Sequence, residues 1–533
     1  MPDDASGVTD GGRTIVLPGR LRARLGELVP GALTAVSAVV ALTLLVPLVW
    51  VVLQATQLDA ARALDFFLRP DTLGIAVNSV VLVAAVTLGS VLVGVPLAFL
   101  TVQTDLPFRR FWTVVAALPL VIPSYIGAFA FASLVGPRSS FYGLFGTAVV
   151  LTLFSYPYVF LTTRASLRSF DGTVVEAART LGEDRLTAFR RVTLPQVWPG
   201  VAAGSLLVAL YTLSDFGTPM ILQYDVFTRA IYLEYQVNNL GFAALLSLVL
   251  LAFTLVILAG ESRLGTSAEG AHVSSGSRRA GRLELGRWKW PALGFAGLVA
   301  TLGLLVPLGT LVSWLFRTEP GYAAGGYAFR PEYVWNSLSV AGAAAVVAVL
   351  VALPVGYLAA RGDGLLASLP ERATYVGYAT PGVVMGLSLI FFGLNVAGAL
   401  YGTVGILVFA YVARFVPQAV GIIESSVLQV DPEHGEAARS MGDGPLRSFR
   451  RTVLPQVTPG VLAGGALVFL TTMKELPATL MLRPFGFETF VTYIWKVQEA
   501  GYYGQAAVPA LVLVFVSALS MAVILSRERY DVT

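Results

Sequence analysis

Long apolar runs separated by short polar loops make up most of this chain. A helix needs roughly 18 or more consecutive apolar residues to cross a bilayer, and the sequence contains about twelve such runs. We therefore predict an all-α integral membrane protein. Its spans are expected near residues 31–54, 75–102, 112–134, 143–163, 199–221, 239–260, 291–315, 335–359, 374–393, 400–424, 459–481 and 505–526.

The composition agrees with this class of protein. The chain is 56% hydrophobic and 13% charged, whereas an ordinary soluble domain carries about 25% charged residues. Cysteine is absent, which excludes disulfides and thiolate metal sites. We expect no binding of nucleic acid, because the net charge of +4 follows from how the loops are arranged across the membrane.

Lysine and arginine concentrate in alternate loops. With the N-terminus in the cytoplasm, 26 of the 36 basic residues fall in cytoplasmic segments, 8 in outer loops and 2 within spans. Cytoplasmic loops of membrane proteins retain positive charge, so we predict that both termini are cytoplasmic. The polar N-terminal stretch has no small-residue cleavage site, and we expect a cytoplasmic tail there rather than a signal peptide.

One polar segment occurs twice in the chain, 260 residues apart. Residues 176–201 and 436–461 are identical at 16 of 26 positions. A stretch rich in Ser, Gly and Arg lies between the copies and is typical of a flexible linker. Each half then has six spans, and an even number makes the two repeats parallel. The expected parts are an N-terminal tail, a first half, a cytoplasmic linker, a second half and a C-terminal tail, at 1–30, 31–260, 261–290, 291–526 and 527–533.

Each copy of the repeat lies in the loop between the fourth and fifth spans of its half. Its Glu-Ala-Ala-Arg sequence favours a helix, and the Gly six residues after the Glu can end that helix in a left-handed conformation. In the second copy, Asp431 and Pro432 are start signals, and Pro445 can start a further short helix. Pro195 and Pro455 are expected to end the elbow before the fifth span.

The Glu-Ala-Ala triplet, its following Gly and the hydrophobic-Pro pair thirteen residues after that Gly resemble the cytoplasmic loop of ABC importer permeases. The resemblance implies the type I permease fold in the cytoplasmic membrane of a prokaryote, with each loop seated in an ATPase subunit. By position, the residues expected to contact the ATPase are Glu176, Ala177, Ala178, Gly182, Glu436, Ala437, Ala438 and Gly442.

No Gly-x-x-x-x-Gly-Lys-Ser/Thr phosphate loop occurs in the sequence, so we do not expect an enzyme. A partner ATPase is expected to use ATP and Mg, and a homodimer fits two nearly equal docking loops. The resemblance also implies an extracytoplasmic substrate-binding protein and one fused permease chain per complex. We expect no cofactor on the chain itself.

Residues 118–131 and 474–486 are similar to the ferric-iron branch of these importers, which implies uptake of ferric iron by alternating access. Thiamine and aminoethylphosphonate permeases share the fused layout and parts of these motifs, so those substrates stay open. A secondary transporter with two parallel six-span halves is a weaker alternative. The loops between the second and third spans fit its Gly…Asp-Arg…Gly pattern poorly.

Two carboxylates, Asp215 and Glu475, stand at equivalent positions late in the fifth spans. Charges inside a membrane are costly and mark functional positions, and a carboxylate pair suits a hard cation, which prefers oxygen ligands. The alternative is that these charges tie helices together, for instance Glu475 with Arg414 or Lys474. Other residues expected along a substrate path are Tyr125, Tyr211 and Thr472, and no metal ligand is assigned.

Overall fold

The computed structural model describes residues 19–136, 139–169, 194–269, 283–317, 329–362 and 364–527, together with positions 187 and 191. Regular structure in these residues is helical, apart from one bridge between Thr104 and Leu283. Nine helices of the described part are long and apolar enough to cross a membrane, and two bent helix pairs can each form one more span. The prediction of an all-α membrane protein is confirmed.

The helices of the first half are α1 (Gly19–Thr56), α2 (Ala60–Leu68), α3 (Pro70–Gln103), α4 (Arg109–Ala117), η1 (Leu118–Val121), α5 (Ser124–Val135), α6 (Leu144–Ser169), α9 (Leu194–Ser214), α10 (Gly217–Ile221), α11 (Phe227–Gln236) and α12 (Leu240–Glu269). Those of the second half are η3 (Gly286–Trp288), α13 (Lys289–Ala300), η4 (Thr301–Leu305), α14 (Val306–Leu315), α15 (Pro331–Arg361), α16 (Leu365–Ala379), α17 (Gly382–Asn395), α18 (Val404–Leu428), α19 (Pro432–Ser440), α20 (Pro445–Ser448), η5 (Phe449–Val453), α21 (Leu454–Met473), α22 (Pro477–Leu482), α23 (Phe490–Glu499) and α24 (Tyr503–Arg527).

Each predicted apolar run coincides with a helix or with a set of consecutive helices. The expected boundary at residue 260 falls inside α12, which continues to Glu269. Residues 270–282 of the expected linker lie outside the described residues, but the linker's end is held in place. Leu283 donates its N–H to the Gln103 carbonyl at 2.8 Å and accepts from the Asp105 N–H at 3.1 Å.

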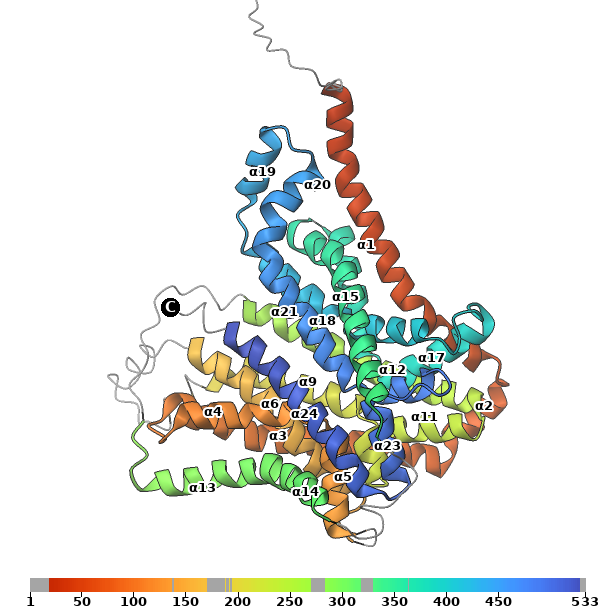
Figure 1. Ribbon diagram of the computed structural model, residues 1–533, viewed down its shortest axis with the longest axis vertical. Coiled ribbons are helices and arrows are strands. Elements are labelled where there is room, and N and C mark those ends of the chain that lie inside the picture. The colour runs from red at the N-terminus through yellow and green to blue at the C-terminus, as the bar shows by residue number, and fades with distance from the viewer. Residues whose placement is uncertain are drawn as a thin grey trace, which may run out of the picture.

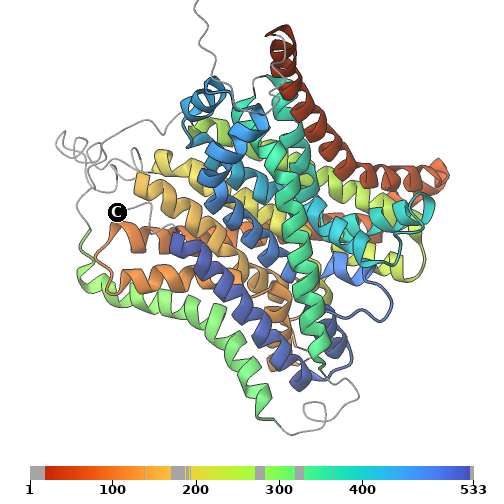
Figure 2. The ribbon, with the colours of Figure 1, turned by 45° about the horizontal axis from the view of Figure 1, so that its top comes forward.

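The first span of each half packs against the other half. Helix α1 lies against α16 and α17, and α14 lies against α5. The rings of Phe129 on α5 and Trp314 on α14 are 4.9 Å apart at their centroids. In Figures 1 and 2, α1 and the α13–α14 pair lie on opposite sides of the bundle. This exchange of first spans joins the two halves into one body.

The bundle has two distinct ends (Figure 1). Helices α19 and α20 stand at the top of the view, beyond the end of α18, whereas α2, α11 and α23 lie at the lower right. Because α21 leads from the α19–α20 elbow into the bundle, the elbow and the α22–α23 loop lie at opposite ends of a span.

Helices α3 and α6 approach closely at Gly94. A Cβ atom placed on Gly94 would lie 2.9 Å from the backbone N of Phe160 and 2.9 Å from the carbonyl O of Tyr156. In the second half, Gly356 on α15 is similarly close to α18, where a Cβ would lie 3.1 Å from the Val420 carbonyl. Small residues permit such close backbone contact, which drives helix association in membranes.

We expect Gly94→Val to lower the free energy of unfolding by about 1–3 kcal/mol, because the added carbons force α3 away from α6. The matched control is Gly74→Val on the same helix, where a Cβ meets nothing within 4 Å. Thermal unfolding of the purified protein in detergent measures both variants. Equal stability of the two would contradict the close-packing role of Gly94.

Candidate functional site: a charged cavity between the two halves

The third span of each half is broken rather than straight. The axis turns by 90° between the segments Arg109–Val121 and Ser124–Val135, and by 104° between Leu365–Ala379 and Gly382–Asn395. A proline stands at each break, Pro123 before α5 and Pro381 before α17. Proline has no N–H and disfavours helical geometry in the residue before it, so the helix ends there.

The fifth spans are broken as well, and a carboxylate stands at each break. Helix α9 ends at Ser214 and α21 at Met473, and each is followed by a short helix, α10 or α22. Asp215 Oδ1 accepts from the Thr218 N–H at 2.9 Å, and Glu475 Oε1 accepts from the Ala478 N–H at 3.2 Å. Each carboxylate therefore satisfies one N–H group in the first turn of the short helix that follows it.

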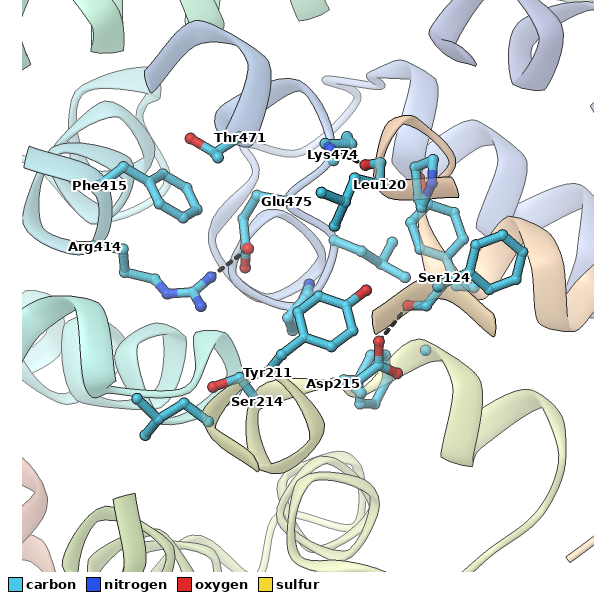
Figure 3. A pocket seen from close by; sticks show the side chains of 18 of the residues that line it. Leu120, Ser124, Tyr211, Ser214, Asp215, Arg414, Phe415, Thr471, Lys474 and Glu475 are labelled. Carbon is cyan, nitrogen blue, oxygen red and sulfur yellow. Dashed lines mark hydrogen bonds and ion pairs between the residues drawn. The ribbon is translucent and has the colours of Figure 1, made fainter. Parts of the chain in front are cut away.

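Three of the four breaks line a cavity of about 210 Å³, and Tyr378, just before the break at Pro381, lines it as well, so both halves contribute (Figure 3). Its polar lining includes Tyr125, Tyr211 and Asp215 from the first half and Arg414, Lys474 and Glu475 from the second. Four of the five expected path residues thus meet here. Thr472 is buried but does not line the cavity, whereas its neighbour Thr471 does and donates to Gln418 Oε1 at 3.1 Å.

Asp215 is held by the broken third span of its own half. The Ser124 hydroxyl, at the first turn of α5, donates to Asp215 Oδ2 (Figure 3). The Thr228 hydroxyl donates to the Asp215 carbonyl at 2.7 Å and links the break to α11. The first contact holds the carboxylate against α5, and the second holds the Asp215 backbone against α11.

Glu475 is held differently, by an ion pair with Arg414 on α18. Both side chains are only 8% exposed. Gly382 makes room for the pair, because a Cβ on it would lie 2.3 Å from Glu475 Oε1 and 2.8 Å from Arg414 Nη1. The ion pair is the helix tie that the sequence left open as an alternative to a cation path.

Lys474 is a cavity residue that sequence reasoning considered only as a partner for Glu475. Its ammonium group donates instead to the Leu120 carbonyl, at 2.9 Å, in the broken third span of the other half (Figure 3). Its charge and intramembrane position were the signal for a functional role. Among the described residues, no group of three or more His, Asp or Glu side chains could hold a metal ion.

The second copy of the repeated loop forms the predicted elbow. The Asp431 side chain caps α19 by accepting from the Glu433 N–H at 2.9 Å, and Gly442 ends the helix with φ +98°. The Ser448 hydroxyl ties α20 to α19 by donating to the Gly435 carbonyl at 3.0 Å. Glu436 and Ala437 are exposed, whereas Ala438 is buried.

The expected end of the elbow at Pro455 is wrong. The chain stays helical from Pro445 to Met473, and Pro455 lies in the first turn of α21. The π-helical turn η5 precedes it, and there the Leu454 N–H donates to the Phe449 carbonyl, five residues back. This local change of register accommodates a proline without ending the helix. In the matching first copy, Glu176, Ala177, Ala178 and Gly182 lie outside the described residues, whereas Pro195 lies in the first turn of α9.

We expect Arg414→Met to lower the free energy of unfolding by about 3–5 kcal/mol, because it leaves the Glu475 charge buried and unpaired. The double variant Arg414→Met/Glu475→Gln should lose less of the free energy of unfolding. The glutamine at position 475 carries no charge, and its amide oxygen can still accept from the Ala478 N–H. Thermal unfolding in detergent compares the two. A double variant as unstable as the single one would show that the ion pair does not explain the burial of Glu475.

Comparison with known proteins places this architecture in a family. Residues 90–261 and 352–529 each match the family described as "Binding-protein-dependent transport system inner membrane component". An Fe(3+)-transport system permease protein of Haemophilus influenzae is 32% identical over 494 residues, which are 92% of this chain and 97% of that protein. A ferric transport system permease protein of Actinobacillus pleuropneumoniae is 24% identical over 84% of this chain and 70% of that protein.

A sulfate transport system permease protein of Salmonella typhimurium is 28% identical over 43% of this chain and 91% of that protein. It therefore corresponds to one half of the present chain. Permease subunits of this kind are not enzymes, and their family implies an ATPase and a substrate-binding protein as partners. The chain, with its two matched halves and its membrane-spanning helices, belongs to the binding-protein-dependent inner membrane components, the permease subunits of ABC transporters.

Proposed function

We propose that this chain is the channel subunit of an importer that moves ferric iron across the cytoplasmic membrane. The observation that carries the proposal is the 32% identity to a ferric-iron permease along 92% of the chain. In this proposal an extracytoplasmic binding protein delivers the iron. A separate ATPase uses ATP and Mg, and the chain itself holds no cofactor.

The proposed orientation puts both termini and the elbow in the cytoplasm. The bias of Lys and Arg toward those segments supports it. The loop between α22 and α23 then faces the outside, at the other end of the α21 span. The binding protein would approach on that side and the ATPase on the elbow side.

The elbow is proposed to dock on the ATPase. Glu436, Ala437 and Gly442 lie on its exposed surface, and Met441 beside them is 84% exposed. A large apolar side chain with that exposure can bury its surface in a partner. Two nearly equal loops in one chain suit two copies of a single ATPase, so one fused permease chain would complete the complex.

Closure of the ATPase dimer on ATP would draw the two elbows together and switch the helix bundle between inward-facing and outward-facing states. The cavity between the halves would then be part of the path that opens to each side in turn. In this proposal Asp215 and Glu475 shape the path by bracing the broken helices, and Tyr125 and Tyr211 contribute to its lining.

We expect the complete transporter in proteoliposomes to hydrolyse ATP faster with an iron-loaded binding protein than with a thiamine-loaded or aminoethylphosphonate-loaded one. In the proposed mechanism, a binding protein that carries the correct substrate docks on the permease and favours the conformation in which the ATPase dimer is closed. Entry of radioactive iron into the vesicles gives a second measurement. Stimulation by a thiamine-loaded protein alone would contradict the iron assignment.

We expect Glu436→Ala combined with Gly442→Val to reduce ATP-driven transport while the spans stay inserted. The first change removes an exposed carboxylate, and the second strains a backbone with φ +98°, which favours glycine. Iron entry and binding of the ATPase to the permease are both measured. The matched control is Glu332→Ala, an exposed acid in the first turn of α15. Unchanged transport in the double variant would refute the docking role.

A further inference from the structure

Two adjacent polar residues near the start of α15 hold the start of α23, which lies at the outer face in the proposed orientation. The Asn336 side-chain amide donates to the Glu488 carbonyl at 2.9 Å. The Ser337 hydroxyl accepts from the N–H of Phe490, the first residue of α23, at 2.7 Å. Because Asn336 and Ser337 are buried, loss of either side chain would leave a backbone group without a partner.

The first half contains the same arrangement. Asn78 on α3 donates to the Asp225 carbonyl at 3.0 Å, and Ser79 accepts from the N–H of Phe227, the first residue of α11, at 3.1 Å. In each half the pair thus bonds the first N–H of the outer helix and the carbonyl two residues before it. The loops that precede α11 and α23 differ in sequence and in length. A bonding pattern common to both halves indicates that the placement of each outer helix is constrained.

The segment before α23 is an exposed turn whose base is closed by charge. Phe485 at its tip is fully exposed. The Glu488 carboxylate pairs with Arg483 at the other side of the turn and lies 3.6 Å from the Lys496 ammonium on α23. A protein docked on this turn would therefore act on Glu488, and the carbonyl of Glu488 is the one that Asn336 holds.

The other end of α15 contacts both ends of the elbow. Arg361, the last residue of α15, donates through its guanidinium to the Val427 carbonyl at 3.1 Å and to the Val430 carbonyl, where the chain enters α19. The ring of Tyr357 lies against the ring of Phe449, where the chain leaves α20, with 5.2 Å between the centroids. Helix α15 is thereby attached to the elbow as well as to the outer helix.

Helix α15 is continuous between these two attachments. It contains 31 residues, which at about 1.5 Å per residue span roughly 46 Å. In Figure 1 it runs from the region of the elbow toward α23. The third and fifth spans of the same half are broken and can bend at their breaks. A rigid element bonded at both ends can carry energetic coupling between distant sites.

We propose that α15 is a strut through which a binding protein docked on the outer turn acts on the elbow, with Asn336, Ser337 and Arg361 as its positioning residues. This inference rests on the proposed docking of a binding protein outside and of the ATPase on the elbow. Displacement of α23 would pull α15 through two hydrogen bonds and move the elbow through the Arg361 contacts. None of the three residues lines the charged cavity, so substitutions there leave the substrate path intact.

The test measures ATP hydrolysis by the complete transporter in proteoliposomes, with and without a saturating amount of iron-loaded binding protein. Ser337→Ala should lower the maximal stimulation about fivefold, the effect of losing one hydrogen bond, while unstimulated hydrolysis stays the same. Ser337→Thr keeps a hydroxyl and should restore most of the stimulation. The matched control is Ser339→Ala, because that exposed hydroxyl donates within α15, to the Asn336 carbonyl at 3.1 Å.

Arg361→Met tests the cytoplasmic end of the strut. It should lower maximal stimulation to a similar degree while the ATPase stays bound to the permease, because the exposed surface of the elbow is unchanged. The matched control is Arg287→Met, at an exposed arginine of η3. If both residues act through α15, the double variant Ser337→Ala/Arg361→Met should lose little more stimulation than either single variant, whereas the effects of independent sites would multiply.

Full stimulation in both single variants overturns the proposal, and so does a double variant in which the two losses multiply. Where one single variant does not fold, the other decides alone. If a different loaded binding protein stimulates the unaltered transporter and the iron-loaded one does not, the iron assignment is wrong, and the same variants are compared with that protein. Absence of stimulation by every loaded binding protein in the unaltered transporter contradicts the proposed function itself.

Discussion

The structure depends on one constraint: a helix broken inside a bilayer exposes backbone groups that lipid cannot satisfy. Four spans of this permease are broken, the third and the fifth of each half. Asp215 and Glu475 accept from N–H groups of the short helices that follow them. Lys474 donates to the Leu120 carbonyl in the opposite half. Charged side chains within the spans thus bond to backbone groups at the breaks, and they make the cavity beside the breaks polar.

The two halves meet this constraint with different residues. In the first half a short carboxylate, Asp215, reaches a serine at the start of α5. In the second half a longer carboxylate, Glu475, lies against a glycine at the start of α17 and is neutralised by Arg414. The duplicated fold therefore encloses an asymmetric cavity. In the proposed function this asymmetry is compatible with transport, because a solute passing through the cavity would not need to bind both halves equally. Docking to two like subunits would instead favour two like loops.

Hydropathy was sufficient to predict the spans, since about twelve apolar runs all became helices. Hydropathy did not predict the breaks. Residues on both sides of Pro123 and Pro381 are apolar, so the mean hydropathy along the chain stays high across each proline. The prediction of Thr472 as a path residue is off by one position, because Thr471 lines the cavity and the rotation of a helix cannot be read from its composition. The sequence wrongly predicts a helix end at Pro455, because the π-helical turn before it has no sequence signature.

The sequence does not decide whether Glu475 serves a cation path or ties helices together, because it does not show which neighbour a side chain reaches. Arg414 is 61 residues away along the chain and becomes a neighbour only when α18 packs beside α21. Lys474 shows the same limit more clearly. It precedes Glu475 directly, but both residues lie beyond the end of α21 at Met473. The Lys474 ammonium group bonds to the other half, whereas Glu475 pairs within its own.

The elbow and the cavity are connected by a single helix. From Pro445 to Met473 the chain is helical over 29 residues, which at about 1.5 Å per residue spans roughly 44 Å. Lys474 and Glu475 follow directly at its end. A force applied at the elbow would therefore reach the cavity through a rigid element and would need no relay of loops. Lys474 is bonded to Leu120 of the first half, and Glu475 is paired with Arg414 of the second half. Movement of this one helix must therefore strain or break one contact between the halves and one contact inside the second half. The charged residues that satisfy the broken helices are thereby the same residues through which a motor on the elbow would change the shape of the passage.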